Sequence, residues 1–247
     1  TLLRRLLKSF IDTWLFKAQM RVHQLHSWSV TPDEAISIQQ ELKGWVIPQD
    51  QFIEIRTVAY VETCIEANTI CCATVHLYRL PTLTTLEQYS ARERFRFPAI
   101  DGLSAFQRAP AVLAALGKLR VDPDLIICDG PGLTHPRRFG LACHVGVLTN
   151  IPTIGLEEFD NSSNRLPLLK RRGAWVPGSR ERDMTSGILC LRPDLNPVVI
   201  SPGHKISLHS AMKHLLRCVP RNPQHNSLEA VIYPTTGNSH SIIPSIS

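Results

Sequence analysis

The chain has 247 residues, 43% of them hydrophobic, and carries a formal net charge of +6. This length suits one large domain or two small ones and is enough to bury a substantial core. No stretch of about 18 apolar residues occurs, so the sequence predicts no transmembrane helix. The positive charge favours an acidic partner such as nucleic acid, although charge alone identifies no partner.

Seven cysteines are present, most of them within apolar, strand-like runs, and no Cys-X-X-Cys pair occurs among them. The missing pair argues against a zinc site. The odd number and the apolar surroundings favour reduced, buried thiols. We therefore expect an intracellular protein of a reducing compartment, with cytoplasm, nucleus and organelle all left open.

Residues 1–27 form a basic extension whose one acid is Asp12. Large apolar residues recur along its first half, as in an amphipathic helix: Leu2, Leu3, Leu6, Leu7, Phe10 and Trp14. A transit peptide, a membrane-surface helix, a helix that binds other protein chains and a helix packed on its own domain all fit this pattern.

The first predicted helix begins at 31–34, because Thr31 can cap it, proline suits the first turn and acids favour its positive end. It should run to about Lys43, before a glycine. Strand-like segments rich in apolar residues follow at 52–63, 68–78 and 83–91. Their short connections predict an antiparallel meander.

A second helix is predicted over 102–119 from its apolar positions. A strand at 125–128, a helix at 137–149 and a strand at 153–156 then predict a βαβ unit with a parallel strand pair. Antiparallel and parallel strands crossed by helices indicate an α/β sandwich.

The segment 159–182 is polar and basic and contains several Gly and Pro residues, which is typical of a loop. Two strands and one helix complete the predicted elements, at 185–192, 197–201 and 207–217. From Pro220 onward large apolar residues are few, so we expect poor order there apart from a short strand at 230–233.

The most informative stretch is DGPGLTHPRRFGLACH, which begins with Asp129 at the carboxyl end of a predicted strand. Open α/β sheets build their sites at that end. Gly130 and Gly132 let the backbone come close to a ligand. Three side chains that can contact phosphate follow: His135, Arg137 and Arg138. Together these residues indicate nucleic-acid chemistry, although a glycine-rich turn and a solvated helix start have the same composition.

This stretch resembles the endonuclease V family, and five further segments resemble the same family in the same order: 27–42, 56–63, 97–110, 151–155 and 198–208. The resemblance spans roughly 27–217. It implies an RNase H-like α/β fold, a mixed sheet flanked by helices, and metal-dependent cleavage of DNA or RNA that contains inosine. We accordingly place the endonuclease V-like domain at 28–233, followed by a disordered tail at 234–247.

The resemblance also assigns roles to residues. It places Glu62, Asp129 and His204 at catalytic positions and gives Glu62 and Asp129 as the ligands of Mg²⁺, if a metal is bound. It places a second set against the nucleic acid, including the pocket for a flipped base: Gly130, Gly132, His135, Arg137, Arg138 and Lys205.

Three positions and one short segment depart from the family pattern. Glu62 replaces an aspartate, Arg108 replaces a metal-binding glutamate and Glu158 replaces a lysine. The wedge, Pro98–Asp101, lacks the family's aromatic ring. A guanidinium stays charged near neutrality and repels a divalent cation. Because Arg108 and Glu158 reverse the family's charges, we predict a salt bridge from Arg108 to Glu158, Glu62 or Asp129.

Two functions follow from this pattern. We favour a pseudonuclease, which would bind nucleic acid without a metal or cleavage, as a binding or structural module in a larger assembly. The alternative is an active Mg²⁺-dependent endonuclease that cuts a phosphodiester near inosine.

Overall fold

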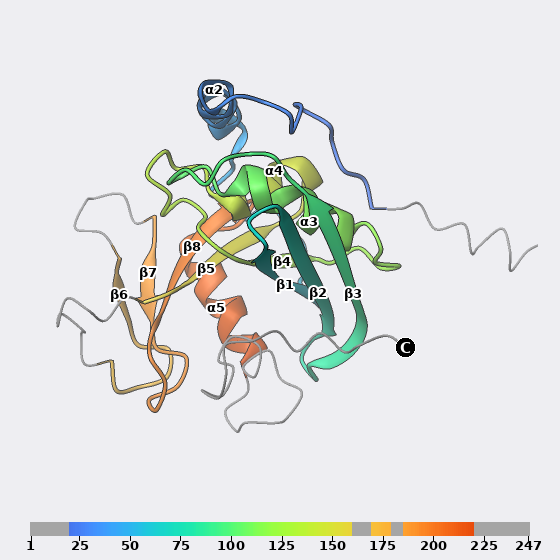
Figure 1. Cartoon of the computed structure of the whole chain (residues 1–247). Coiled ribbons are helices and arrows are strands. Elements are labelled where there is room, and N and C mark those ends of the chain that lie inside the picture. Colours follow the sequence, from blue (N-terminus) through green and yellow to red (C-terminus); the bar gives the residue numbers. More distant parts are fainter. Residues whose placement is uncertain (1–19, 160–168, 179–184, 220–247) are drawn as a thin grey trace, which may run out of the picture.

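The structure is a computed structural model that describes residues 20–159, 169–178 and 185–219. Its centre is one mixed sheet with strand order β3-β2-β1-β4-β5-β8-β7-β6 (Figure 1). The strands are β1 (Thr57–Glu66), β2 (Ile70–Arg79), β3 (Thr84–Arg94), β4 (Leu125–Asp129), β5 (Thr153–Glu158), β6 (Trp175–Pro177), β7 (Gly187–Leu189) and β8 (Val198–His204). The helices are α2 (Pro32–Leu42), the 3-10 helix η1 (Lys43–Trp45), α3 (Ala105–Leu116), α4 (Leu141–Thr149) and α5 (Leu208–Cys218).

The strand pairing confirms the predicted topology. Strands β1, β2 and β3 form an antiparallel meander, and β4 pairs in parallel with both β1 and β5. Strand β8 then runs antiparallel to β5. The fold is therefore the expected mixed sheet flanked by helices.

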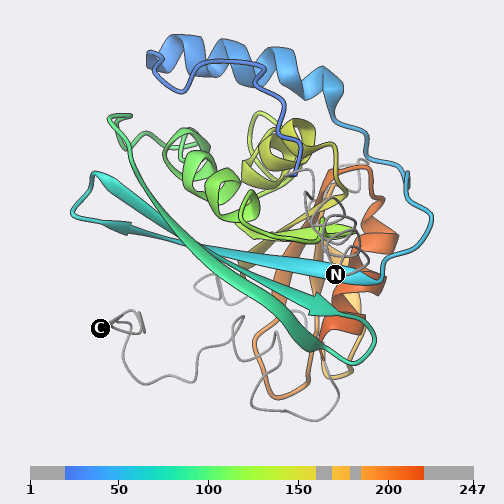
Figure 2. The same cartoon turned by 90° about the vertical axis from the view of Figure 1, so that its right-hand side faces the viewer.

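Helices cover both faces of the sheet (Figure 2). Residues of α3 and α4 share one buried apolar cluster with alternate residues of the central strands, including Ile126 and Cys128 of β4. Residues of α5 share a second cluster on the other face, with Leu125 and Ile127. Because each fully buried Leu or Ile contributes about 1.5–3 kcal/mol, these two clusters hold β4 firmly in the middle of the sheet.

The start of α2 is the predicted one. The hydroxyl of Thr31 accepts a hydrogen bond from the Glu34 backbone N–H at 3.3 Å, and the Glu34 carboxylate accepts from the Thr31 N–H at 2.7 Å. This reciprocal pair is a capping box, which satisfies two backbone donors at the helix start.

Three expectations differ from the structure. Helix α4 begins at Leu141 rather than 137, because the N–H of Gly140 is held by the carbonyl of Gly132 at 3.2 Å. Strand β6 lies inside the segment 159–182 that was expected to be a loop. Residues 20–27 are not helical.

Instead, the segment 20–27 lies along α4. The backbone N–H of His23 donates to the Leu148 carbonyl at 2.7 Å, and His26 Nε2 lies 2.6 Å from His144 Nε2. The apolar half of the basic extension, the strand expected at 230–233 and the tail 234–247 fall outside the described residues. Among the described helices, none combines the length and the apolar character needed to cross a membrane.

Candidate functional site

Three carboxylates lie on three neighbouring strands: Asp129 and Glu158 are the last residues of β4 and β5, and Glu62 lies in β1 just past the point where its pairing with β4 ends. The parallel register of β1 and β4 pairs Val61 with Cys128, so the next residues, Glu62 and Asp129, stand beside each other. Asp129 pairs with Leu156 of β5, and Glu158 follows two positions later. Since alternate residues share a face, all three carboxylates lie on the face that α5 covers farther along the strands.

The charges of this group act on Asp129. Burial raises the pKa of the Asp129 carboxyl, the Arg108 guanidinium lowers it, and the negative charges of Glu62 and Glu158 raise it again, so that the pKa ends above its ordinary value. Asp129 is therefore a partly buried member of a group with excess negative charge.

Glu62 also has a neighbour on β2. Its Oε1 lies 3.5 Å from Nε2 of His76, and its side chain is 44% exposed. Glu158 is exposed as well. Two of the three carboxylates can therefore change rotamer without disturbing the core.

Glu157 is a fourth carboxylate near Asp129, and sequence reasoning did not single it out. It accepts a hydrogen bond from the Thr134 hydroxyl at 2.6 Å. Burial raises its pKa, the bond from Thr134 lowers it, and the charge of Asp129 raises it further. The sequence signal was the Glu157–Glu158 pair at a strand end, which places one acid on each face of the sheet.

The predicted salt bridge of Arg108 does not form. Among the described residues, no ion pair within 4.0 Å joins Arg108 to Glu62, Asp129 or Glu158, and its buried Nε lacks a hydrogen-bond partner. The reason is its position on α3, which packs on the opposite face of the sheet from the three carboxylates. Arg108 acts on Asp129 through space rather than by contact.

The structure does not bring His204 to the carboxylates. Asp129 pairs with Leu156 of β5, whereas His204 pairs with Thr153, three residues back along the same strand. At ~3.3 Å per residue this puts His204 about 10 Å away along the strands and two strands across. His204 is 4% exposed, and burial followed by the charge of Lys205 lowers its pKa to about 4. It is a neutral, buried side chain at the far end of β8.

The glycines after Asp129 are needed for packing. Gly130 has φ +148°, a conformation that L side chains rarely adopt, and its N–H donates to Leu156 O at 2.8 Å. A Cβ on Gly132 would lie 2.3 Å from the carbonyl oxygen of Pro202. The N–H of Gly132 donates to the Ser201 hydroxyl at 3.0 Å. These contacts fasten the loop to β8 and occupy backbone groups that the predicted base pocket would use.

His135 and Arg137 contact protein rather than point outward. His135 Nε2 donates to the carbonyl oxygen of Gly102 at 2.8 Å, and Arg137 Nη2 donates to the same oxygen at 2.7 Å. Arg137 Nε also donates to Gln39 Oε1 at 2.6 Å. Both residues therefore hold the carbonyl of Gly102, which directly follows the wedge Pro98–Asp101.

Arg138 and Lys205 both adopt positive φ, at 55° and 53°. The N–H of Arg138 donates to His135 O at 2.6 Å, which closes the turn before α4. The N–H of Lys205 donates to Ile47 O at 2.6 Å, which ties the end of β8 to the segment that precedes β1. Lys205 therefore lies with His204, away from the carboxylates.

The donor set of the carboxylate group suits a hard cation such as Mg²⁺, which prefers one or two carboxylates and water. The oxygens of Glu62, Asp129 and Glu158 do not all lie within 4.8 Å of one another. Burial is the main cause of the raised pKa of Asp129, and the negative charges of Glu62 and Glu158 add to it, so a cation bound here would stabilise the Asp129 carboxylate.

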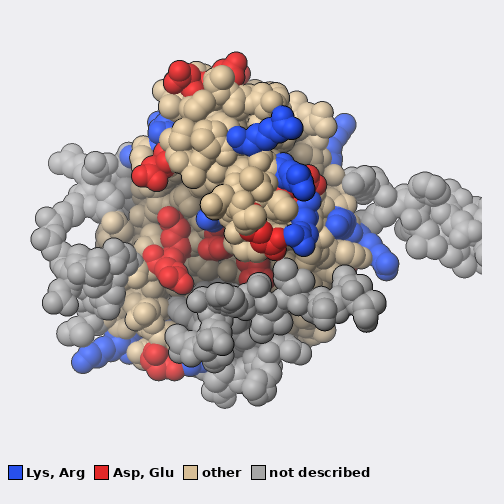
Figure 3. All heavy atoms as spheres, viewed as in Figure 1, with Lys and Arg blue, Asp and Glu red and all other residues tan. Residues whose placement is uncertain are grey.

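Figure 3 shows Asp and Glu side chains gathered near the middle of one face, around a hollow. Lys and Arg side chains lie beside this acidic patch and at the edge of the same face. An acidic centre with a basic border is suited to a cation in the middle and a phosphate backbone that passes over it.

Comparisons with known proteins agree on one family. The family profile described as Endonuclease V matches residues 40–227. The endonuclease V of Trichormus variabilis is 42% identical over 204 residues, which cover 82% of this chain and 92% of that protein. The crystal structure of endonuclease V from Streptomyces avermitilis matches with a TM-score of 0.74 and 32% identity, over 87% of this chain and 95% of that one.

A third comparison is with Ciona intestinalis endonuclease V in complex with a 24mer DNA that contains an inosine followed by a ribo-adenosine. It matches with a TM-score of 0.68 over 81% of this chain and 95% of that chain. At 20% identity this likeness is one of fold.

Proposed function

Because the chain belongs to the endonuclease V family, we propose that it is a metal-dependent endonuclease acting on DNA or RNA that contains inosine. The observation that carries this proposal is the group of carboxylates at Glu62, Asp129 and Glu158, which three adjacent strands present on one face. Phosphodiester hydrolysis needs such a group to hold a divalent cation.

The two charge departures support a rearranged site rather than a lost one. An acid is missing from α3 at Arg108, and an acid is present on β5 at Glu158. The exchange leaves three carboxylates around the ends of β1, β4 and β5. Arg108 lies on the other face of the sheet and makes no contact with these carboxylates. Its charge therefore weakens the binding of a cation there but does not occupy the cation's position.

The residues of this chain would have separate roles in the reaction. Glu62, Asp129 and Glu158 would hold Mg²⁺, which when bound supplies an activated water and charge neutralisation at the phosphate. The wedge would hold the nucleic-acid strand beside these carboxylates, since Gly102, the residue after the wedge, is fixed by Arg137. We place this domain at 28–233.

The substrate class rests on relatives. The Ciona intestinalis protein is described in complex with inosine-containing DNA, and this chain shares its fold. The loop at Gly130 and Gly132 would border a flipped base, with contacts limited to backbone groups that β8 does not already occupy.

Binding without cleavage is the second candidate. Arg108 favours it, because a guanidinium that has no ion-pair partner among the described residues and lies within electrostatic range of Asp129 opposes a divalent cation. The comparisons lend this candidate no support, since the matching relatives are described as endonuclease V.

A cleavage assay separates the two candidates. Single-stranded DNA and RNA with one inosine would be incubated with the protein and Mg²⁺ or Mn²⁺, beside the same strands with adenosine. We expect metal-dependent cleavage of the inosine strands that is lost in Asp129→Ala and kept in the control Asp122→Ala, an exposed acid outside the site. Binding to the inosine strands without product in either metal would establish the second candidate.

A further inference from the structure

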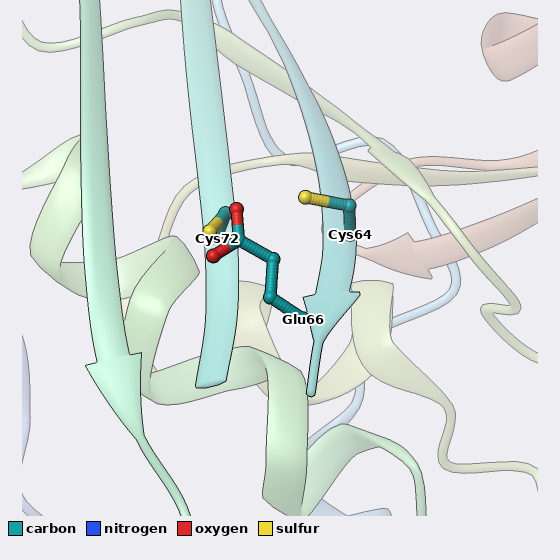
Figure 4. Close-up of side chains that lie close together, drawn as sticks. All are labelled: Cys64, Glu66 and Cys72. Atoms are coloured by element: carbon teal, nitrogen blue, oxygen red, sulfur yellow. The ribbon is translucent and has the colours of Figure 1, made fainter. Parts of the chain in front are cut away.

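A second group of metal-binding side chains lies on the β1–β2 hairpin, beyond the carboxylates. Cys64 of β1 stands directly opposite Cys72 of β2 in the antiparallel register. Glu66 is two residues farther along β1, so its side chain leaves the same face as Cys64. Figure 4 shows the two sulfurs and the Glu66 carboxylate turned toward one another.

The spacing of these atoms suits a metal ion. The sulfurs of Cys64 and Cys72 and a carboxylate oxygen of Glu66 all lie within 4.8 Å of one another. Tetrahedral zinc with Zn–S bonds of ~2.3 Å separates two sulfurs by roughly 3.8 Å. Small rotations of these side chains would therefore close the group around an ion.

The third ligand is already oriented. Arg92 of β3 pairs with Cys72 in the register and forms an ion pair with Oε2 of Glu66. This contact leaves Oε1 of Glu66 for another partner. Metal-binding carboxylates are commonly held by such an outer hydrogen bond.

The chemistry of the group also suits a cation, because a carboxylate and two thiols face one another. Three groups that can each carry a negative charge thus converge, and Arg92 offsets one of them.

Solvent can reach this group. Strand β4 pairs with β1 only over Val58–Val61, so the hairpin projects past it (Figure 2). Cys64 is exposed, whereas the other cysteines, all in the described part of the chain, are buried.

We propose that Cys64, Glu66 and Cys72 bind a thiophilic divalent cation of the Zn²⁺ class, with a fourth position open to water. Zinc accepts Cys and carboxylate ligands together, whereas Mg²⁺ avoids sulfur. This site is chemically separate from the carboxylates and does not depend on the proposed function. A search for a Cys-X-X-Cys pair could not find this site, because its ligands come from two different strands.

Cobalt titration of the full chain under reducing conditions tests the proposal, since thiolate ligands give Co²⁺ a sulfur-to-metal absorption in the near ultraviolet. We expect this band to saturate at one ion per chain and to disappear when Zn²⁺ is added. It should be lost in Cys64→Ser and in Cys72→Ser, and Glu66→Gln should weaken binding about tenfold or more.

Two controls make the result specific. Cys71→Ala changes the neighbouring thiol, which faces the core on the other side of β2, and should leave the band unchanged. Asp129→Asn should leave it unchanged too, because that carboxylate belongs to the other site. The exposed position of Cys64 keeps its serine variant folded, as thermal unfolding would verify. A wild-type protein without the band, or a band that survives in folded Cys64→Ser, would overturn the proposal.

Discussion

Arg137 donates a hydrogen bond from Nη2 to the carbonyl oxygen of Gly102 at 2.7 Å. The same oxygen accepts from His135 at 2.8 Å and from Gln39 Nε2 at 3.0 Å. Gly102 directly follows the wedge Pro98–Asp101, Gln39 lies on α2, and the two other donors lie in the loop after β4. One carbonyl therefore joins three segments that are distant in sequence.

Replacing Arg137 with Gln should loosen this junction. Hydrogen bonds from charged donors contribute about 1.5–3 kcal/mol, and Oε1 of the buried Gln39 would lose its donor at the same time. We expect the free energy of unfolding to fall by about 2 kcal/mol in urea denaturation. Arg96→Gln, at an exposed arginine, is the control and should change it by less than about 0.5 kcal/mol. Equal losses in both variants would contradict the structural role.

Gly132 should not tolerate a side chain. A Cβ there would meet the Pro202 carbonyl oxygen at 2.3 Å, so Gly132→Ala must push the loop away from β8. We expect a loss of about 1–3 kcal/mol of unfolding free energy. Gly44→Ala is a matched control, because nothing lies within 4 Å of its added Cβ. The loss should be absent there, and a Gly132→Ala protein as stable as Gly44→Ala would show that the close approach is wrong.

Stability should fall in mild acid because of buried histidine. Burial lowers the pKa of His204 from 6.5 to about 4, so the unfolded chain takes up the proton first. This contribution is complete above about pH 6.5 and is lost as the pH falls toward 4, at about 1.4 kcal/mol per pH unit. His204→Gln should reduce the slope of unfolding free energy against pH between 6 and 4, measured by urea denaturation.

The exposed His209 is the control for this slope. His209→Gln should retain the pH dependence of the wild type. A slope that is the same in all three proteins would contradict a neutral, buried His204.

Removing the cation on α3 should strengthen metal binding. Arg108 lies close enough to lower the pKa of Asp129, so the same charge repels a divalent ion at the carboxylates. We expect Arg108→Gln to raise Mn²⁺ affinity about tenfold, equivalent to about 1.4 kcal/mol, in calorimetric titration. Arg94→Gln, an exposed arginine on β3, should leave the affinity unchanged. An unchanged Mn²⁺ affinity in Arg108→Gln would contradict the proposed repulsion between Arg108 and the bound cation.

Much of the fold follows from local patterns. The helix cap at Thr31 and the strand predicted from the apolar run before Asp129 each depend on neighbours in sequence, and both predictions hold. The start of α4 was placed too early, since the residues before Leu141 form a turn in which the Gly140 N–H is held by the Gly132 carbonyl. Hydrogen bonds to a distant loop override local preference there.

The site was less accessible to sequence reasoning, because strand register decides it. The motif around His204 was placed with the carboxylates, but the pairing of β5 with β8 carries it to the other end of the strands. The opposition of Cys64 and Cys72 is likewise a property of two paired strands. Glu62 and Asp129 were predicted to converge, since residues at the carboxyl ends of adjacent parallel strands meet at one edge.

The most direct test is a calorimetric Mn²⁺ titration of the wild type and of Glu158→Gln. In the proposed site Glu158 on β5 binds the metal in place of the acid that α3 lacks. We therefore expect Mn²⁺ to bind at least tenfold more weakly to Glu158→Gln and with wild-type affinity to Glu41→Gln, which changes an exposed acid on α2. Wild-type affinity in Glu158→Gln, combined with its loss in Asp129→Asn, would contradict the role given to Glu158.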